Sequence, residues 1–459
     1  MLAIRRSSGS LACAMAGRRV GWLARRVAMG PLVPCTLLAM FGMPCARADD
    51  PPATMPAHHH MDAMALSDEM PAMTMPGMLG PFTMSREASG TSWQPDSTPV
   101  SGIEHMGSPW TTMWDGFANL LYDHQGGPRG QAKTVSTSML MFMGRRQCDD
   151  GAWGIRLMAS GDPLMGRNGY PELFQTGETA DGVRPLIDRQ HPHNLLMEAA
   201  ATYSRNLSDR ASAFAYAGIA GEPALGPPAF MHRFSGMDNP LAPLGHHWLD
   251  ATHISYGVFT AGTTWSNARI EASAFNGREP GPNRYQVDLG RLDSNALRLS
   301  WNPVADLSLQ ASSGRLASPE QLQPGTAVRR TTASASYNFR IGDIVAQTTL
   351  AWGRNVPLPG NSSDAWLLES AVRADARRTV FLRVERVGKD ELFLPGQPLY
   401  GQVFRIDSLS MGYIHDFARV ESARIGIGAM GTVYGYAAAL NPIYGESPFS
   451  GLLFLRVRL

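Results

Sequence analysis

The segment ASASYNFRIGD, residues 333–343, contains the pattern that decides the fold of this chain. Its apolar residues, from Ala333 to Phe339, occupy every second position, and serine and asparagine lie between them. A repeat of two residues is that of a β-strand, whose successive side chains point to opposite faces of a sheet. The sequence RIGD then makes a tight connection to a second predicted strand near 344–353. The segment therefore predicts two strands joined by a short turn.

The same alternation recurs from about Thr111 to the end of the chain. In NALRLSW (295–301), for example, Leu297, Leu299 and Trp301 lie opposite Arg298. The expected strands lie near residues 112–123, 133–147, 153–161, 195–206, 212–220, 251–264, 268–276, 293–302, 307–315, 328–340, 344–353, 365–375, 379–387, 403–416, 424–436 and 451–459. The count is about 16, with about 14 as the alternative, and both are even numbers, as in bacterial outer-membrane barrels.

Tight and long connections alternate between these strands. The tight connections contain the sequences CDDGA (148–152), NLSDRA, WSNA, NPVAD, RIGD, ADARRT and HDFARVE. An outer-membrane barrel has short turns at its periplasmic end, longer outer loops, an apolar outer face and a polar interior. The sequence therefore predicts an all-β fold, a transmembrane antiparallel up-and-down β-barrel over residues 110–459, located in the cell outer membrane. A soluble all-β protein is the alternative.

Residues 1–48 have the order of a bacterial signal peptide. They contain seven arginines and no acidic residue, followed by a short apolar run and the sequence CARA. We expect cleavage after Ala48. A transmembrane anchor is the alternative, but the apolar run is short and is interrupted by proline and glycine. Removing the segment leaves 33 basic and 39 acidic residues, and this negative balance argues against a nucleic-acid partner.

Residues 49–109 are rich in Met, Pro, Ser and Gly and show no strand or helix period, so we expect a flexible arm. Within it, MPAHHHMDAMALSDEMPAMTMPGM (55–78) contains seven methionines and three histidines. Thioether sulfur is a soft ligand that suits Cu(I), and imidazole binds copper as well. The candidate ligands are His58, His59, His60, Met61, Met64, Met70, Met73, Met75 and Met78. A linker of low complexity without a metal role is the alternative.

A second group of candidate ligands lies in two long connections of the expected barrel. The loop before the strand near 195–206 contains DRQHPHN, and the loop before the strand near 251–264 runs from GPPAFMHRF to DATH. The candidate ligands are His191, His193, His232, His246, His247 and His253. Loops on one rim could bring imidazoles together, and Asp188, Asp238 or Asp250 could orient a ring. For any single histidine, ordinary hydrogen bonding within the loop is the alternative.

Long loops in compact proteins are usually functional or disordered. Because these two are rich in Pro and Gly and contain aromatic residues, we expect ordered loops that fold over or into the barrel mouth. The sequence contains no G-x-S-x-G, P-loop or H-E-x-x-H motif, so no enzymatic activity is expected.

Seven segments carry a resemblance to a known family. They are SGTSWQPDSTP (89–99), YDHQGGPRG (122–130), LFQTGETADG (173–182), LIDRQHPHNLLMEAA (186–200), GEPALGPPAFMHRFSGMDNP (221–240), HHWLDATHISYGV (246–258) and SAFNGREP (273–280). They resemble a family of uncharacterised bacterial outer-membrane proteins that are often encoded beside copper-resistance determinants. The arm is similar in composition to the N-terminal part of copper resistance protein B, and no residue role is carried over from that likeness.

The sequence thus predicts an outer-membrane barrel that takes part in the binding of copper or silver, in its transport, or in resistance to it. The ligand or cargo would be copper ions, with Cu(I) favoured, collected by the arm and bound or gated by the histidine-rich loops. Expected partners are outer-membrane lipid, metal ions and periplasmic copper proteins. The alternatives are a general diffusion porin without a metal role and a surface copper-dependent oxidase.

Overall fold

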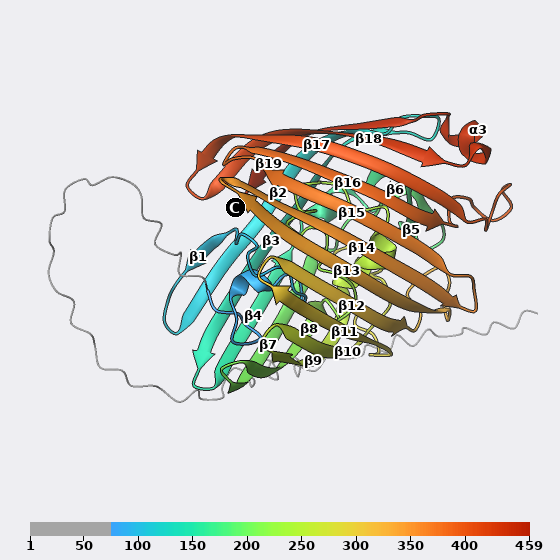
Figure 1. The fold of residues 1–459 in the computed structure, drawn as a ribbon. Coiled ribbons are helices and arrows are strands. Elements are labelled where there is room, and N and C mark those ends of the chain that lie inside the picture. Colours follow the sequence, from blue (N-terminus) through green and yellow to red (C-terminus); the bar gives the residue numbers. More distant parts are fainter. Residues whose placement is uncertain (1–74) are drawn as a thin grey trace, which may run out of the picture. The chain divides into compact units, whose positions relative to one another are not determined.

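The computed structural model describes residues 75–459, which form a closed antiparallel β-barrel of 16 strands (Figure 1). Consecutive barrel strands are hydrogen-bonded neighbours, and the last strand, β19 (Phe449–Arg458), pairs with the first, β2 (Trp110–His124). This pairing closes the sheet, so every barrel strand has a partner on both sides. The predicted fold class and the strand count of about 16 are confirmed.

The other barrel strands are β3 (Ala132–Cys148), β4 (Gly151–Ala159), β7 (Leu196–Ser208), β8 (Ala211–Gly221), β9 (Ser255–Trp265), β10 (Ala268–Phe275), β11 (Ser294–Val304), β12 (Leu307–Leu316), β13 (Ala327–Ile341), β14 (Ile344–Leu358), β15 (Ser363–Arg373), β16 (Arg378–Lys389), β17 (Phe404–Val420) and β18 (Ala423–Tyr436). The remaining elements are β1 (Ile103–His105), β5 (Tyr170–Thr179), β6 (Pro185–Gln190), the helices α2 (His246–Leu249) and α3 (Asn441–Tyr444), and the 3-10 turns η1 (Met84–Arg86), η2 (Asp162–Met165), η3 (Ala251–His253) and η4 (Ala438–Leu440). No helix in residues 75–459 is long and apolar enough to cross a membrane.

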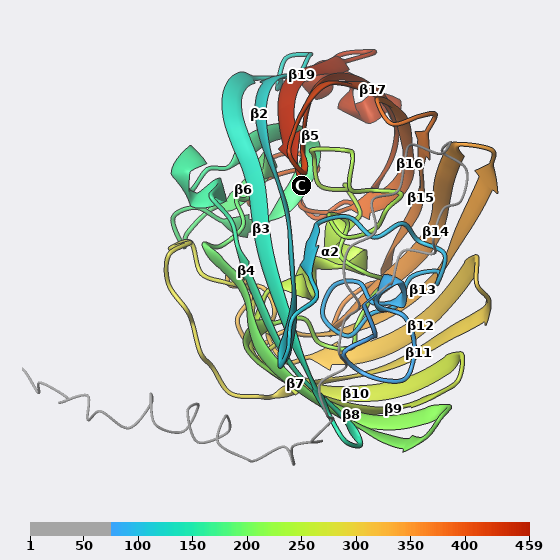
Figure 2. The ribbon, with the colours of Figure 1, turned by 90° about the vertical axis from the view of Figure 1, so that its left-hand side faces the viewer.

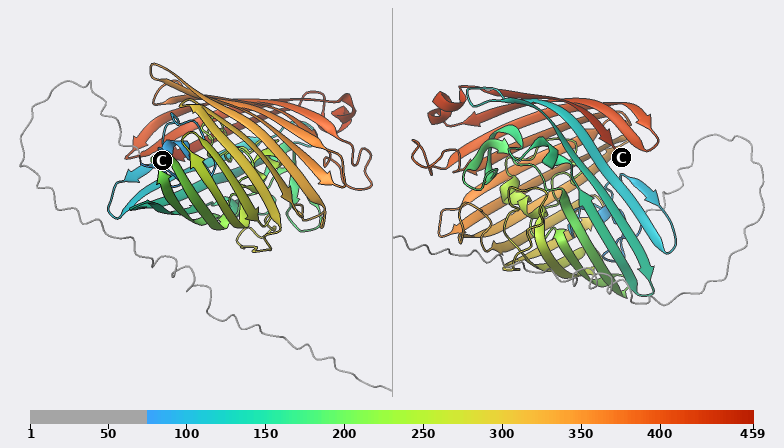
Figure 3. Two further views of the ribbon diagram at one scale, coloured as in Figure 1. Left: turned by 60° about the horizontal axis from the view of Figure 1, so that its bottom comes forward. Right: turned by 180° about the vertical axis from the view of Figure 1, so that it is seen from behind.

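Short turns lie at one end of the barrel and long connections at the other. Two residues join β13 to β14 at the predicted RIGD turn, and turns of similar length occur at the other six predicted places. Figure 1 shows the C-terminus and β1 at the short-turn end, and β5, β6 and α3 at the opposite end. Figure 3 shows the same separation from two further sides. The alternation of loop lengths in the sequence therefore corresponds to the two ends of the barrel.

The outer face of the barrel is apolar and the inner face is polar. On β11, Leu297, Leu299 and Trp301 are about half exposed, whereas Arg298 between them is completely buried in the interior. The other strands alternate in the same way; on β10, Ile270 faces outward. A continuous band of exposed apolar side chains around a closed barrel is stable in hydrocarbon, where the closed sheet leaves no backbone group unpaired. The chain is therefore a transmembrane barrel of the outer membrane.

Three segments fill the interior of the barrel. They are the N-terminal residues 75–101, the β5–β6 hairpin and the connection 222–254 between β8 and β9. Nearly all residues of the connection 222–254 are buried. Figure 2 shows the N-terminal segment and α2 inside the ring of strands. The hairpin is held at the long-loop end, where Phe174 stacks on Tyr444 at 4.2 Å between ring centroids. The predicted ordered loops are thus present, and they lie inside the barrel.

The segment from Met75 differs from the expected flexible arm of residues 49–109. Met75 and Met78 are completely buried, and the Glu87 carboxylate accepts hydrogen bonds from the backbone N–H groups of Met78 and Leu79 at 2.8 and 2.9 Å. Arg156 of β4 donates to two carbonyl oxygens of the same segment. The composition of the segment predicted no core of its own, but the barrel wall supplies its partners. Residues 49–74 lie outside the described part of the chain.

Candidate metal site

Five of the six predicted loop histidines lie together inside the barrel. The ring centroid of His246 is 5.3 Å from that of His253, 5.5 Å from that of His247 and 6.2 Å from that of His191. His193 lies 5.3 Å from His253. We call these five residues the histidine cluster. They come from the connection after β6 and from the long connection before β9, so two segments about 50 residues apart form one site.

Local structure explains how these rings are placed. His246 and His247 lie on the single-turn helix α2, and His253 lies on η3, which follows directly. The Phe230 ring packs against the cluster, with centroid distances of 6.0, 5.6 and 6.4 Å to His193, His246 and His253. The apolar ring and the surrounding barrel shield the imidazoles from water.

The long connection is tied to the barrel wall by a buried ion network. Arg233 donates to Asp250 at 2.7 Å and to Glu369 on β15 at 2.6 Å, and all three side chains are about 1% exposed. Burying such charges is tolerated only when they are paired and hydrogen-bonded. Although burial opposes ionisation, the Arg233 guanidinium and the His246 ring hold the pKa of Asp250 below its usual range. A charged Asp250 is therefore fixed directly beside the cluster.

Each imidazole of the cluster has its Nδ1 atom next to a fixed oxygen. The pairs are His191 with Pro192 O (3.4 Å), His193 with Asp162 Oδ2 (2.8 Å), His246 with Asp250 Oδ1 (2.8 Å), His247 with Glu279 Oε1 (3.2 Å) and His253 with Asp250 O (2.8 Å). A backbone carbonyl oxygen only accepts, as does the ionised Asp250 carboxylate, so Nδ1 of His191, His246 and His253 carries the proton and donates. The Nε2 lone pair is then free to bind a metal ion.

The Nε2 atoms of all six loop histidines are buried and lack a hydrogen-bond partner within residues 75–459. His191 Nε2 lies 3.2 Å from Glu178 Oε1, but the angle does not make a hydrogen bond. A buried polar atom without a partner costs about 1–3 kcal/mol. The Nε2 atoms of these buried rings therefore remain available to accept a hydrogen bond or to bind a ligand.

Burial keeps four of the imidazoles, those of His191, His246, His247 and His253, neutral. It lowers the pKa of His191, His246 and His253 below the ordinary value, and that of His247 to about 4. The positive charge of Arg284 lowers the pKa of His191 further, while the Asp250 hydrogen bond partly offsets the shift at His246. Only a neutral imidazole offers a lone pair to a metal, so these four rings meet one chemical requirement of a metal ligand at neutral pH.

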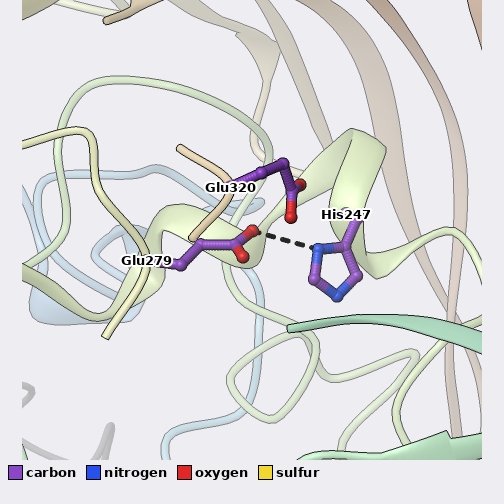
Figure 4. A group of neighbouring side chains, drawn as sticks. All are labelled: His247, Glu279 and Glu320. Atoms are coloured by element: carbon purple, nitrogen blue, oxygen red, sulfur yellow. Dashed lines mark hydrogen bonds and ion pairs between the residues drawn. The ribbon is translucent and has the colours of Figure 1, made fainter. Parts of the chain in front are cut away.

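Carboxylates lie at the edge of the cluster (Figure 4). Ligand atoms of His247, Glu279 and Glu320 are within 4.8 Å of one another, and Figure 4 shows the His247 ring directed toward Glu279. Burial and the negative charge of neighbouring glutamates raise the pKa of Glu279 and Glu320 well above the ordinary value. These two glutamates were not predicted from the sequence. Acidic residues are common in long loops, and their spacing gave no signal.

The other predicted ligands lie elsewhere. His232 is outside the cluster, and it borders a cavity of about 70 Å³ together with methionines. Met75 and Met78 are buried in the interior among further methionines. The remaining candidates of the arm, from His58 to Met73, lie outside the described residues. The inward methionines of the barrel wall were not predicted from the sequence, although MLMFM at 139–143 places methionine at three alternate positions of one strand.

No protein-family model and no curated protein sequence matches this chain. Among solved structures, the anion-selective porin from Comamonas acidovorans is similar over 76% of this chain and 100% of its own, with 12% identity and a TM-score of 0.48. OprB of Pseudomonas putida is similar over 76% of this chain and 94% of its own, with 8% identity and a TM-score of 0.47. OmpF of Salmonella typhi, solved with daunomycin, covers 78% of this chain and 100% of its own, with 9% identity and a TM-score of 0.46. The barrel and its apolar exterior define the class of this chain, an outer-membrane β-barrel protein.

Proposed function

We propose that this barrel binds copper, with Cu(I) favoured and silver as a chemical analogue, at the histidine cluster in its interior. The observation that supports this most strongly is the shared arrangement of the rings, with Nδ1 held by an oxygen and Nε2 buried and unpartnered. Metal-binding histidines typically have this arrangement, because the hydrogen bond at Nδ1 fixes the tautomer and the ring orientation.

Copper is favoured over other metals for two chemical reasons. Copper(II) lies at the top of the affinity order of divalent metals for nitrogen ligands, and Cu(I) accepts both imidazole and thioether. Thioethers are close at hand, because Met231 follows Phe230 directly and lines a small void together with His193. The resemblance of the seven segments between residues 89 and 280 to proteins encoded beside copper-resistance determinants points in the same direction.

In this proposal the protein sequesters copper or controls its passage, and it carries out no covalent chemistry. A general diffusion porin needs an open lumen, whereas three segments fill this one. The Met/His-rich residues 55–73 would collect copper on the periplasmic side, where periplasmic copper proteins are the expected partners. The interior loops would then hold the ion inside the barrel.

The test is an anaerobic titration of the full mature chain with Cu(I) against a chromogenic competitor. The variant His246→Asn, His253→Asn removes two Nε2 atoms, while each new amide can still donate to the oxygen that held Nδ1. The matched control is His105→Asn, His124→Asn, which changes two exposed histidines outside the cluster. We expect the cluster variant alone to lose at least one bound copper. Equal binding by both variants, with folding intact, would contradict the proposal.

A further inference from the structure

Methionine is concentrated in one part of the barrel interior. One buried cluster contains ten methionines among its 17 residues. Three of them, Met139, Met141 and Met143, occupy alternate inward positions of β3. Met113 on β2 and Met158 on β4 belong to the same cluster. Leucine fills such positions with better-defined rotamers, so this concentration of thioethers indicates a role beyond packing.

A cavity lies within this methionine-rich region. Its volume is about 70 Å³, and its soft lining atoms come from Met84, Met113, Met141, Met143, Met237 and His232. The cavity has room for an ion or about two water molecules. The Nε2 atom of His232 is buried and has no hydrogen-bond partner within residues 75–459. Burial, aided by the positive charge of Arg156, lowers the pKa of His232 to about 3, so the ring is neutral.

Charged groups at the edge of the cavity are partly engaged in hydrogen bonds and ion pairs. Glu87 accepts the backbone N–H groups of Met78 and Leu79, and Asp115 accepts that of Gly116. Arg156 lies 3.4 Å from Glu198 and donates to the N-terminal segment, so its charge is compensated. The ligands that remain for a guest are five neutral thioethers and one neutral imidazole, together with Glu87 Oε2 and Gln94 Oε1, which are buried and have no hydrogen-bond partner within residues 75–459. Such a set suits a soft ion of low charge and is poor for Mg²⁺, Ca²⁺ or Zn²⁺.

We propose that this methionine-lined cavity is a second metal site, which binds one soft monovalent cation, Cu(I) or Ag(I), through thioether sulfurs and His232 Nε2. The inference deepens the proposed copper role, but the site shares no ligand with the histidine cluster. The two sites lie near each other, because Met237 lines both this cavity and the smaller void that also borders His193. The N-terminal segment forms the other wall of the cavity, directly after the Met/His-rich residues.

The experiment measures Ag(I) bound per full mature chain, by equilibrium dialysis and elemental analysis. The test variant is Met141→Leu, Met143→Leu, which conserves side-chain volume and removes two sulfurs from the cavity. The matched control is Met158→Leu, Met197→Leu, which removes two sulfurs of the same buried cluster that do not line the cavity. Heat-modifiable migration on a gel checks that every variant is a folded barrel.

We expect the test variant to lose one Ag(I) and the control to bind as many as the wild type. If both variants bind the same number of Ag(I) ions per chain, whether as many as the wild type or fewer, the second site is refuted. The variant His246→Asn, His253→Asn, titrated in parallel with Cu(I), separates the two proposals. If this variant loses copper while Met141→Leu, Met143→Leu loses no silver, the result supports the histidine cluster and refutes the second site. If the methionine variant loses silver while the histidine variant keeps its copper, the result supports the second site alone.

Discussion

Asp250→Asn is the substitution whose effect the structure defines most closely. One carboxylate oxygen of Asp250 accepts from His246 Nδ1 at 2.8 Å, and the other accepts from Arg233 at 2.7 Å. Asparagine has only one side-chain oxygen, so its NH₂ group must face one of these two donors. If the NH₂ group faces His246, the ring changes tautomer and Nε2 carries the proton instead of the lone pair. If it faces Arg233, the anchor of the long connection is weakened.

The expected loss is a 10- to 100-fold weaker affinity for copper, the usual effect of removing a carboxylate that orients a metal-binding histidine. This corresponds to about 1.4–2.7 kcal/mol of binding free energy. The folded barrel should survive, because Arg233 keeps Glu369 at 2.6 Å. The hydrogen bond of His253 Nδ1 is kept, because its partner is the backbone oxygen of residue 250.

The assay is the competitive Cu(I) titration of the full mature chain at neutral pH. Asp150→Asn is the matched control, because Asp150 lies in an exposed turn and its contact with Arg205 is 3.8 Å long. The control should bind copper as the wild type does. An affinity of Asp250→Asn within about twofold of the wild type, with the barrel folded, would refute the role of His246 as an oriented ligand.

Three further predictions concern pH, the ion network and the arm. The histidines of the unfolded chain are protonated near pH 6.5, whereas burial lowers the pKa of His247 in the folded chain to about 4. The unfolded chain therefore binds more protons between these values, and the free energy of unfolding measured in urea should decline as the pH falls from about 6.5 to about 4. Copper binding should persist below pH 6, because the buried ring stays neutral there. Arg233→Met should destabilise the barrel by about 3–5 kcal/mol in the same urea-unfolding assay, because the buried carboxylates of Asp250 and Glu369 each lose their shortest ion pair. Arg354→Met, at a half-exposed pair, should cost at most about 1 kcal/mol. Deleting residues 49–74 should lower the number of bound Cu(I) ions without removing those in the interior, and an unchanged number would show that the arm is only a linker.

The barrel was predictable because its signals are local. The alternation of polarity within residues 295–301 is enough to place Leu297 on the outer face and Arg298 on the inner face. The RIGD turn likewise depends only on residues within the turn. The β5–β6 hairpin and the packed segment from Met75 were not predictable in the same way. Their order depends on partners in the barrel wall, such as Arg156, that are distant in the sequence.

The candidate site was predictable in its residues but not in its geometry. Histidines in two long loops could be found by composition, yet the separation of His232 from the other five depends on how residues 222–254 fold inside the barrel. The pairing of His247 with Glu279 joins two different loops, and no spacing in the sequence indicates it. The inward methionines were visible as alternate positions of a strand, but their common cavity required the closed barrel.

Copper binding at the histidine cluster can be observed by anomalous diffraction at the copper edge, from crystals of the full mature chain grown with copper. We expect a copper peak within bonding distance of two or more Nε2 atoms of the histidine cluster. This peak should disappear in the variant His246→Asn, His253→Asn. An ordered, well-resolved cluster without a peak, in crystals where copper is bound elsewhere on the chain, would contradict copper binding at this cluster.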